Sequence, residues 1–188
     1  MRFPVLLFSL AMAATVGGCS GDKAASTDTQ PAAKPAKEAV SARRHDESSY
    51  AEPDKVRITD LALDLALDFE QKQLAGTATY TLDWTDPQAT RLLLDTRELT
   101  IAKVEGEADG AWAPLQFALA DADPVFGSKL AIEAPQRNPR IRVSYHTAPT
   151  ASGLQWLEPS MTEGKQLPFM FSQSQQIHAR SWVPLQDT

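Results

Sequence analysis

VRITDLALDLALDF, residues 56–69, alternates large apolar side chains with aspartate and alanine over most of its length. Leucine recurs at every second position from Leu61 to Leu67. A period of two is typical of a β-strand with one buried face, because successive side chains point to opposite faces of a sheet. The period slips by one residue at Thr59–Asp60, so we expect a β-bulge there. The stretch predicts a long, half-buried strand that opens a β-domain.

Further segments of strand character follow this one along the chain. EQKQLAG (70–76) predicts a turn, and TATYTLDW (77–84) predicts the returning strand of a hairpin. RLLLDTRELTIAKVEG (91–106) contains a short, fully apolar strand core at Leu92–Leu94. Between Pro, Gly, Asp or Asn, the runs WAPLQFALA (112–120), KLAIEA (129–134) and RIRVSYHT (140–147) each carry four to nine residues of strand character. No long helical stripe and no internal repeat occurs. We therefore expect an all-β fold of packed antiparallel sheets.

The first residues, MRFPVLLFSLAMAATVGGC, have the pattern of a secretory signal. Arg2 precedes an apolar run, Val5–Val16, which is too short to span a bilayer comfortably, and two glycines precede Cys19. A cysteine at this place resembles the bacterial lipobox. The resemblance implies that residues 1–18 are removed and that Cys19 carries lipid, which anchors the chain by burying acyl groups. An ordinary signal peptide with an incidental cysteine is the alternative.

Ser20 follows the cysteine where inner-membrane lipoproteins carry aspartate, so the lipobox resemblance implies the periplasmic side of the outer membrane, in the cell envelope. Residues 20–50 contain almost no large apolar side chains and cannot bury enough surface to offset the entropy of ordering. We therefore expect residues 19–51 to form a flexible linker ahead of a domain at 52–188. The basic group Arg43, Arg44 and His45 is interpreted as a solvated spot.

Charge and motifs exclude several classes of function. The net charge of −6 disfavours nucleic-acid binding, because an acidic surface repels phosphate. The three histidines, His45, His146 and His178, have no second ligand at a zinc-binding spacing, and no Gly-x-Ser-x-Gly motif occurs. Asp64 and Asp68 alternate along one strand face and are interpreted as solubility residues rather than an acid–base pair. Taken alone, the residues hold no complete catalytic constellation.

The last stretch, GLQWLEPSMTEGKQLPFMFSQSQQIHARSWVPLQDT (153–188), gathers glutamines, a histidine, an arginine and a tryptophan. It resembles the zinc aminopeptidases of the aminopeptidase N family (peptidase family M1), in the branch that contains leukotriene-A(4) hydrolase. The resemblance is carried by four blocks in the family's order, and LAGTATYTLDW and LLLDTRELTIAKV extend it upstream to about residue 52. The four blocks are Leu154–Leu157, Thr162–Lys165, Phe171–Arg180 and Pro184–Thr188.

The resemblance implies a saddle-shaped N-terminal β-domain, with antiparallel or mixed sheets in a sandwich, packed on a thermolysin-like catalytic domain. In the family, Gly-x-Met-Glu-Asn and His-Glu-x-x-His motifs follow this region and bring the zinc that supports removal of N-terminal amino acids from peptides. The chain ends before those motifs. We therefore expect a fragment that holds no zinc itself and is inactive alone, although the intact family member carries zinc.

By position, the resemblance makes Gln175 the residue that reaches the free α-amine of the peptide substrate, and Gln173 a neighbouring pocket residue. A glutamine oxygen can accept hydrogen bonds from ammonium, but only glutamate adds full charge attraction. The other interpretation of Gln175 is a plain exposed strand amide. The family also implies a cis peptide bond at Gln175–Gln176.

Other residues near the glutamines are interpreted as structural. His178 is expected to be bonded to backbone or a carboxylate, Arg180 and Asp187 to pair or brace a turn, and Trp156 and Trp182 to pack in the core. The runner-up function is a stand-alone lipoprotein β-module that binds peptides or a protein partner. A structural envelope protein is a weaker third. Without the catalytic domain, we expect an exposed apolar patch near Phe169–Trp182.

Overall fold

The computed structural model describes residues 46–188, so the expectations for the signal segment and for Cys19 lie outside it. The fold is almost entirely β, as predicted, with two single-turn 3-10 helices, η1 (Pro159–Met161) and η2 (Ala179–Ser181). The strands are β1 (Val56–Asp68), β2 (Gln73–Trp84), β3 (Arg91–Thr96), β4 (Thr100–Ala108), β5 (Ala111–Pro114), β6 (Phe117–Leu119), β7 (Ser128–Glu133), β8 (Arg140–His146), β9 (Leu154–Leu157) and β10 (Phe169–Ser172).

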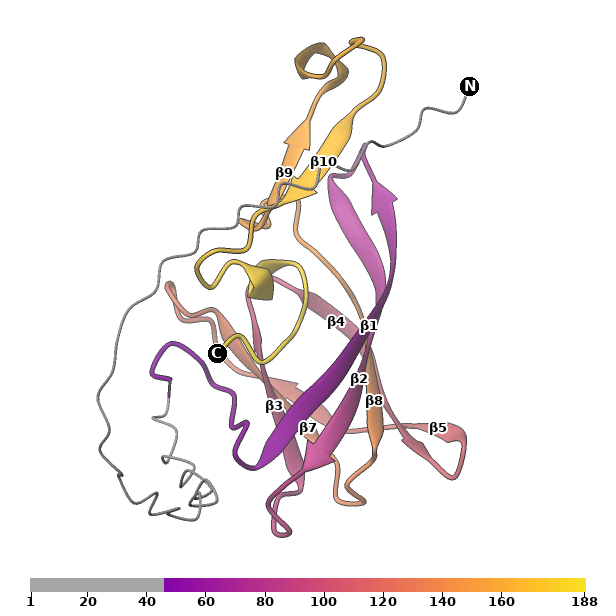
Figure 1. The fold of residues 1–188 in the computed structure, drawn as a ribbon, viewed down its shortest axis with the longest axis vertical. Helices are drawn as coiled ribbons and strands as arrows, with labels where there is room; N and C mark the ends of the chain where they lie inside the picture. The colour runs from indigo at the N-terminus through magenta and orange to yellow at the C-terminus, as the bar shows by residue number, and fades with distance from the viewer. Residues whose placement is uncertain (1–45) are drawn as a thin grey trace, which may run out of the picture. The chain divides into compact units, whose positions relative to one another are not determined.

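The largest sheet has five strands in the order β1-β2-β8-β4-β5, and every neighbouring pair in it is antiparallel. The long β1–β2 hairpin forms one side of this sheet (Figure 1). The predicted bulge is confirmed, because the β1–β2 register shifts between Ile58 and Asp60. The leucines of β1 therefore face the same side as Tyr80 and Ala78 of β2.

A second, three-stranded sheet has the order β3-β7-β6 and is also antiparallel. Its apolar side chains and those of β2, β8 and β4 form one buried cluster, which makes the two sheets a sandwich. The alternation of buried and half-buried residues along β7 and β8 is the period-two pattern predicted from the sequence. The residues at the centre of the cluster are fully buried: Tyr80, Leu92, Leu94, Leu130, Ile132, Ile141 and Val143.

The third sheet is the two-stranded hairpin of β9 and β10, which lies beyond the end of the β1–β2 hairpin (Figure 1). A small second cluster of Leu74, Ala151 and Leu154 joins it to the rest of the domain. Trp156 packs against this cluster and meets the Phe69 ring edge-on at 5.5 Å between centroids. Trp156 and Trp182 are thus packed at the edges of the core and are only partly buried.

The run of strand character at residues 112–120 forms two short strands rather than one. The chain forms β5 up to Pro114 and then crosses to the other sheet as β6. Leu115 still donates its backbone N–H to Val104 of β4, whereas the carbonyl of Gln116 already accepts from Glu133 of β7. Proline ends the first strand because it has no N–H to continue a ladder. Two short strands with similar side chains look like one strand in the sequence.

Residues just before the expected domain boundary at 52 also contact the domain. Ser49 and Ala51 are buried, and Ser49 donates its hydroxyl to the carboxylate of Asp95 at 2.5 Å. The backbone N–H of Tyr50 donates to the same carboxylate at 2.7 Å.

Among the described residues, no helix is long and apolar enough to span a bilayer.

Candidate functional site

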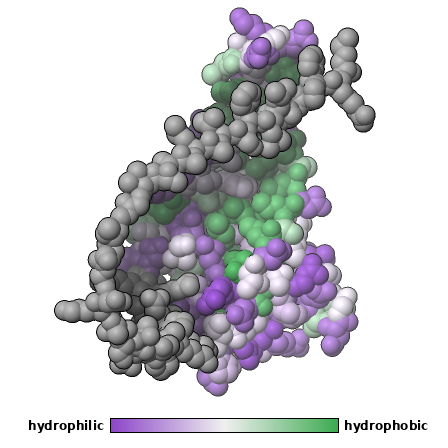
Figure 2. All heavy atoms as spheres, in the orientation of Figure 1, coloured by the Kyte–Doolittle hydropathy of each residue, from purple (hydrophilic) through white to green (hydrophobic). Residues whose placement is uncertain are grey.

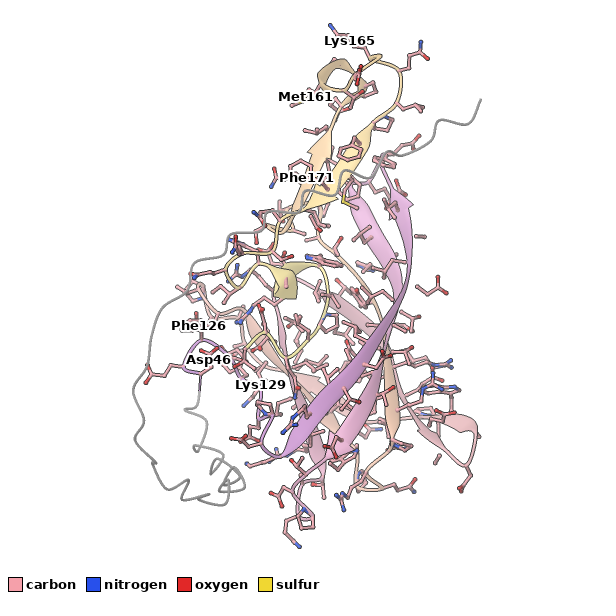
Figure 3. The ribbon with its side chains drawn as sticks, in the orientation of Figure 1. Asp46, Phe126, Lys129, Met161, Lys165 and Phe171 are labelled. Carbon is pink, nitrogen blue, oxygen red and sulfur yellow. The ribbon has the colours of Figure 1, made fainter. Side chains whose placement is uncertain are left out.

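The predicted site residues lie together on the loop between β10 and η2. We call residues Gln173–His178 the rim. The side chains of Gln173, Gln175 and Gln176 are all exposed on it. The rim runs between Phe171, at the end of β10, and the region of Phe126 and Asp46 (Figure 3). The peptide bond between Gln175 and Gln176 is cis, as the family resemblance implied.

Two open hollows meet at the rim, with Gln176 and Ile177 lining both. The first, which we call the glutamine hollow, has a volume of about 610 Å³ and is lined by Gln173 and Gln175 together with Asp46. The second, of about 600 Å³, lies on the His178 side of the rim. Gln175 therefore does not point into a packed interior. Its amide is available to a molecule that enters the glutamine hollow.

The backbone of the rim is fixed by short polar contacts. The indole N–H of Trp182 donates to the hydroxyl of Ser174 at 3.0 Å. The hydroxyl of Ser181 donates to the carbonyl of His178 at 2.7 Å and accepts from the N–H of Gly153 at 2.8 Å. These bonds close the loop on itself and on the turn before β9. The exposed glutamine amides are thus carried by a constrained backbone.

Gly153 is required at this crossing because the rim passes directly over it. A Cβ atom at position 153 would lie 2.6 Å from the carbonyl oxygen of His178 and 2.8 Å from the Trp182 ring. Real Cβ atoms do not come so close to backbone, so any side chain would displace the rim. The ring of His178 is within 2.8 Å of the hydroxyl of Ser152 through Nδ1. Its bond is therefore to a serine hydroxyl, not to backbone or a carboxylate as expected.

A buried ion cluster lies directly after the rim. The side chain of Arg180 is completely buried, and its Nε donates to the Asp187 carboxylate at 3.0 Å, which confirms the predicted pair. Its guanidinium also donates to the carbonyl of Phe126 at 2.9 Å and lies 3.9 Å from the carboxylate of Asp95. A charge in the interior is tolerated only when it is paired and hydrogen-bonded. We call Arg180, Asp95 and Asp187 the anchor.

Asp95 is the member of the anchor that the sequence did not indicate. It is fully buried at the end of the strand that starts RLLLD, and it accepts from Ser49, from Tyr50 and from the backbone N–H of Asp187. Its own backbone pairs with Leu185 in both directions. An aspartate at the end of an apolar run looks like an ordinary strand terminus, and nothing in the sequence reports its distant partners.

Two buried tyrosines hold the segment that follows the rim. Tyr145 donates its hydroxyl to the carbonyl of Trp182 at 2.9 Å, and Tyr80 donates to that of Pro184 at 2.6 Å. Burial raises the pKa of both hydroxyls well above the usual tyrosine value. Both groups therefore remain neutral donors at any physiological pH.

The electrostatics of the glutamine hollow favour a cation. The glutamine amides are neutral and can either donate or accept. Asp46 lines the same hollow, and a hydrogen bond from the backbone N–H of Ser48 lowers the pKa of its carboxyl. Asp187 lines the hollow too, but its carboxylate already pairs with Arg180. The hollow thus offers amide oxygens and the carboxylate of Asp46, a set of acceptors that suits an ammonium group.

The described residues do not supply a metal site. Within residues 46–188, no group of three or more His, Cys, Asp and Glu side chains is placed to hold an ion. His146 lies in the five-stranded sheet and His178 on the rim, so the two histidines of this region do not come together. The side chains of this region therefore do not fit the zinc that the family resemblance implies.

Residues 47–188 match the Peptidase M1 N-terminal domain. The chain belongs to the peptidase M1 family, as its N-terminal domain. This M1 N-terminal domain is 36% identical over 148 residues to leukotriene A-4 hydrolase of Xenopus laevis, a match that covers 76% of this chain and 24% of that protein. It is 34% identical over 146 residues to leucine aminopeptidase 2 of Yarrowia lipolytica, covering 76% and 22%.

Solved structures give the same answer for the fold. The structure of yeast LTA4 hydrolase in complex with bestatin superposes on 80% of this chain, with a TM-score of 0.70 and 28% sequence identity. The chain covers 24% of that structure. It thus spans about a quarter of the length of these relatives. The family and the β-fold predicted from the sequence are confirmed.

Proposed function

We propose that this domain is the substrate-anchoring part of a zinc aminopeptidase, and that Gln175, with Gln173 beside it, binds the free α-amine of a peptide. The observation that carries the proposal is the exposure of both amides into one hollow while the backbone beneath them is fixed. A preorganised acceptor binds more tightly than a mobile one because less entropy is lost. Removal of N-terminal amino acids from peptides is the activity proposed for the intact protein.

Glutamine at position 175 sets the strength of this anchoring. A neutral amide oxygen accepts a hydrogen bond from ammonium, and a carboxylate accepts one roughly twice as strong. The hollow retains the negative charge of Asp46, whereas that of Asp187 is paired with Arg180. The proposed site therefore selects an amine through shape and hydrogen bonding, with weaker charge attraction than a glutamate would provide.

Zinc and the cleavage of the peptide bond are assigned in this proposal to another part of the intact protein. The residues of the domain bind and orient the amine, and in the region from Asp46 onward no group of three or more His, Cys, Asp and Glu side chains is placed to hold a metal ion. We therefore propose that residues 46–188 alone do not hydrolyse peptides.

The proposed contact with the catalytic part is the apolar side of the β9–β10 hairpin. Phe169 is 53% exposed and Leu167 75%, and the rings of Phe169 and Phe171 stack at 6.4 Å. Met161 is exposed at the tip near Lys165 (Figure 3). Exposed apolar side chains in such a group are typical of an interface.

The test uses the protein encoded by the complete reading frame that contains this sequence. Gln175→Ala should lower kcat/KM for an aminoacyl p-nitroanilide about tenfold to a hundredfold, the value of one hydrogen bond to a charged group. Gln175→Glu should restore or raise it. Gln88→Ala, at an exposed turn remote from the rim, is the control. Equal kcat/KM in the Gln175→Ala and Gln88→Ala proteins would overturn the assignment.

The reading frame itself separates the two leading functions. A frame that continues past Thr188 into Gly-x-Met-Glu-Asn and His-Glu-x-x-His supports the aminopeptidase. A stop codon after Thr188 overturns it in favour of a stand-alone lipoprotein β-module that binds peptides or a protein partner.

We also propose that lipid on Cys19 anchors the protein to the outer membrane, on its periplasmic side. Support comes from the sequence pattern alone: a charged start, a short apolar run and small residues before the cysteine. Cys19→Ser should move the protein from the membrane to the soluble periplasmic fraction. Mass spectrometry of the N-terminal peptide should show added acyl chains, and an unmodified Cys19 would contradict the proposal.

A further inference from the structure

The strand β1 lies at an edge of the five-stranded sheet. It is 13 residues long, and β2 is its one neighbour among the strands of residues 46–188. An edge strand presents a row of backbone N–H and C=O groups that another extended chain can pair with. Most natural edges are short, and a long one is a candidate surface for strand addition.

The backbone groups on the open edge belong to the leucines. In β2, Leu82 donates its N–H to Pro139 and Leu74 offers its carbonyl to Thr147, so these alternate residues turn toward β8. The residues between them must turn toward β1, where their partners are the aspartates and alanines. The groups left facing outward after the bulge are therefore those of Leu61, Leu63, Leu65 and Leu67.

One amide already pairs with this edge. Gln186 donates its side-chain amide to the carbonyl of Val56 at 2.7 Å and accepts from the N–H of Ile58 at 3.0 Å. Its carboxamide thus takes the place of a peptide group of a neighbouring strand. The edge therefore has the geometry that strand pairing needs, and beyond the bulge its outward groups bond to none of the described residues.

The two faces of β1 differ in chemistry. On the inner face, Leu63 is 40% and Leu67 48% exposed, and hydrophobic side chains gather over this strand in Figure 2. On the outer face, Asp60, Asp64 and Asp68 alternate with alanine, and Asp60 and Asp64 lie opposite threonines of β2. None of these aspartates forms a salt bridge within the described region, although Asp68 accepts two backbone N–H bonds of the turn that follows.

This charge pattern disfavours a second copy of the chain as the occupant. Two antiparallel β1 strands centred on Asp64 would place aspartate opposite aspartate on one face, and like charges opposite each other destabilise a sheet. A partner strand with Lys or Arg on that face would instead be attracted to the aspartates. The residues between its Lys or Arg would lie on the opposite face and would need to be apolar to cover the exposed leucines.

We propose that the open edge of β1, from Asp60 to Asp68, binds an extended segment of a partner protein in which basic residues alternate with apolar ones. The segment pairs through the outward backbone groups of the leucines. Its basic face lies beside Asp60 and Asp64, and its apolar face covers Leu63 and Leu67. The proposal is independent of the role of Gln175.

The test is titration of the ¹⁵N-labelled full chain with acetyl-KVKVKVKV-amide, followed by NMR. Binding should shift the backbone amides of Leu61, Leu63, Leu65 and Leu67 and slow their exchange with solvent, since those groups become hydrogen-bonded. The matched peptide acetyl-EVEVEVEV-amide should bind at least tenfold more weakly. Shifts confined to other strands, or equal binding of both peptides, would overturn the proposal.

Two variants separate strand pairing from general charge attraction. Asp64→Lys should weaken binding at least fivefold, whereas Asp83→Lys, an exposed site on β2, should leave it within twofold. Leu63→Pro removes one outward N–H at an edge position that tolerates proline, and should weaken binding at least tenfold. Equal losses for Asp64→Lys and Asp83→Lys would show nonspecific attraction. A dimer on gel filtration that Leu63→Pro dissolves would identify a second copy, against the proposal.

Discussion

The rim and the anchor are neighbours in sequence but opposite in environment. Gln173, Gln175 and Gln176 are exposed, while Arg180 is completely buried and bonded on several sides. The chain passes from one environment to the other within one short helical turn, η2. The comparison shows how a domain can present polar side chains at a fixed position. The buried charges hold the loop in a single arrangement. The exposed amides therefore do not have to stabilise the fold themselves.

The largest expected effect removes the buried cation of the anchor. Arg180→Ala should lower the free energy of unfolding by about 3–5 kcal/mol, because the carboxylate of Asp95 would remain buried without its cation. Urea unfolding followed by circular dichroism measures the change. Arg91→Ala, which loses an exposed pair to Glu133, should cost less than about 1 kcal/mol. Equal costs would show that the anchor does not hold the fold.

The next largest loss of stability is expected at Gly153, where the rim passes over the turn before β9. Gly153→Ala should destabilise the domain by about 1–3 kcal/mol, since the new methyl group would collide with the carbonyl of His178. Ser152→Ala, one residue earlier and exposed, is the control and should cost less than about 1 kcal/mol. Thermal melting of both variants gives the comparison, and an unchanged Gly153→Ala protein would mean that the rim is loosely held.

A second ion cluster, in which Glu105 pairs with Arg142 and Lys103, tests the contribution of paired charges through the pH dependence of stability. Hydrogen bonds from Arg142, and then from Lys103, lower the pKa of the Glu105 carboxyl below the usual glutamate value. A lowered pKa in the folded state stabilises above the unfolded pKa, and this stability is lost as pH falls through the folded pKa. At neutral pH the wild-type protein should therefore be more stable than Glu105→Gln. The difference in urea midpoint should disappear in acid, and a difference that persists at pH 2 would contradict the pairing.

The smallest expected effect on stability is at the rim itself. Gln175→Ala should change the free energy of unfolding by no more than about 0.5 kcal/mol, because its side chain is exposed and bonds to none of the residues from Asp46 onward. Differential scanning calorimetry measures it. A loss above about 1 kcal/mol would mean that Gln175 is a structural residue.

The sequence predicted the sheets because their pattern is local. The alternation in β1 and the phase slip at Thr59–Asp60 depend on neighbouring residues, and both are found in the structure. The run at 112–120 shows strand character but not the crossing between sheets, because the crossing depends on pairing with Val104 and Glu133. Local patterns report the faces of strands but not the sheet that each strand joins.

The residues of the candidate site could be named from the sequence, but the contacts that hold them in place could not. Resemblance to the family pointed to Gln173 and Gln175, which line one hollow, and the interpretation of the residues as structural paired Arg180 with Asp187. Asp95 contributes to the anchor from 85 residues away, and Gly153 underlies the rim from another turn. Such contacts form only when the chain folds, so residues that act through distant partners leave no pattern in the sequence.

The measurement that tests the central claim most directly is a crystal structure of the intact protein with a non-cleavable peptide analogue bound. The account predicts the amide oxygen of Gln175 within hydrogen-bonding distance, about 2.7–3.2 Å, of the free α-amine of the analogue. It also predicts that the backbone of the rim stays where the anchor places it. An analogue whose amine is held elsewhere, with Gln175 turned to bulk solvent, would contradict the account.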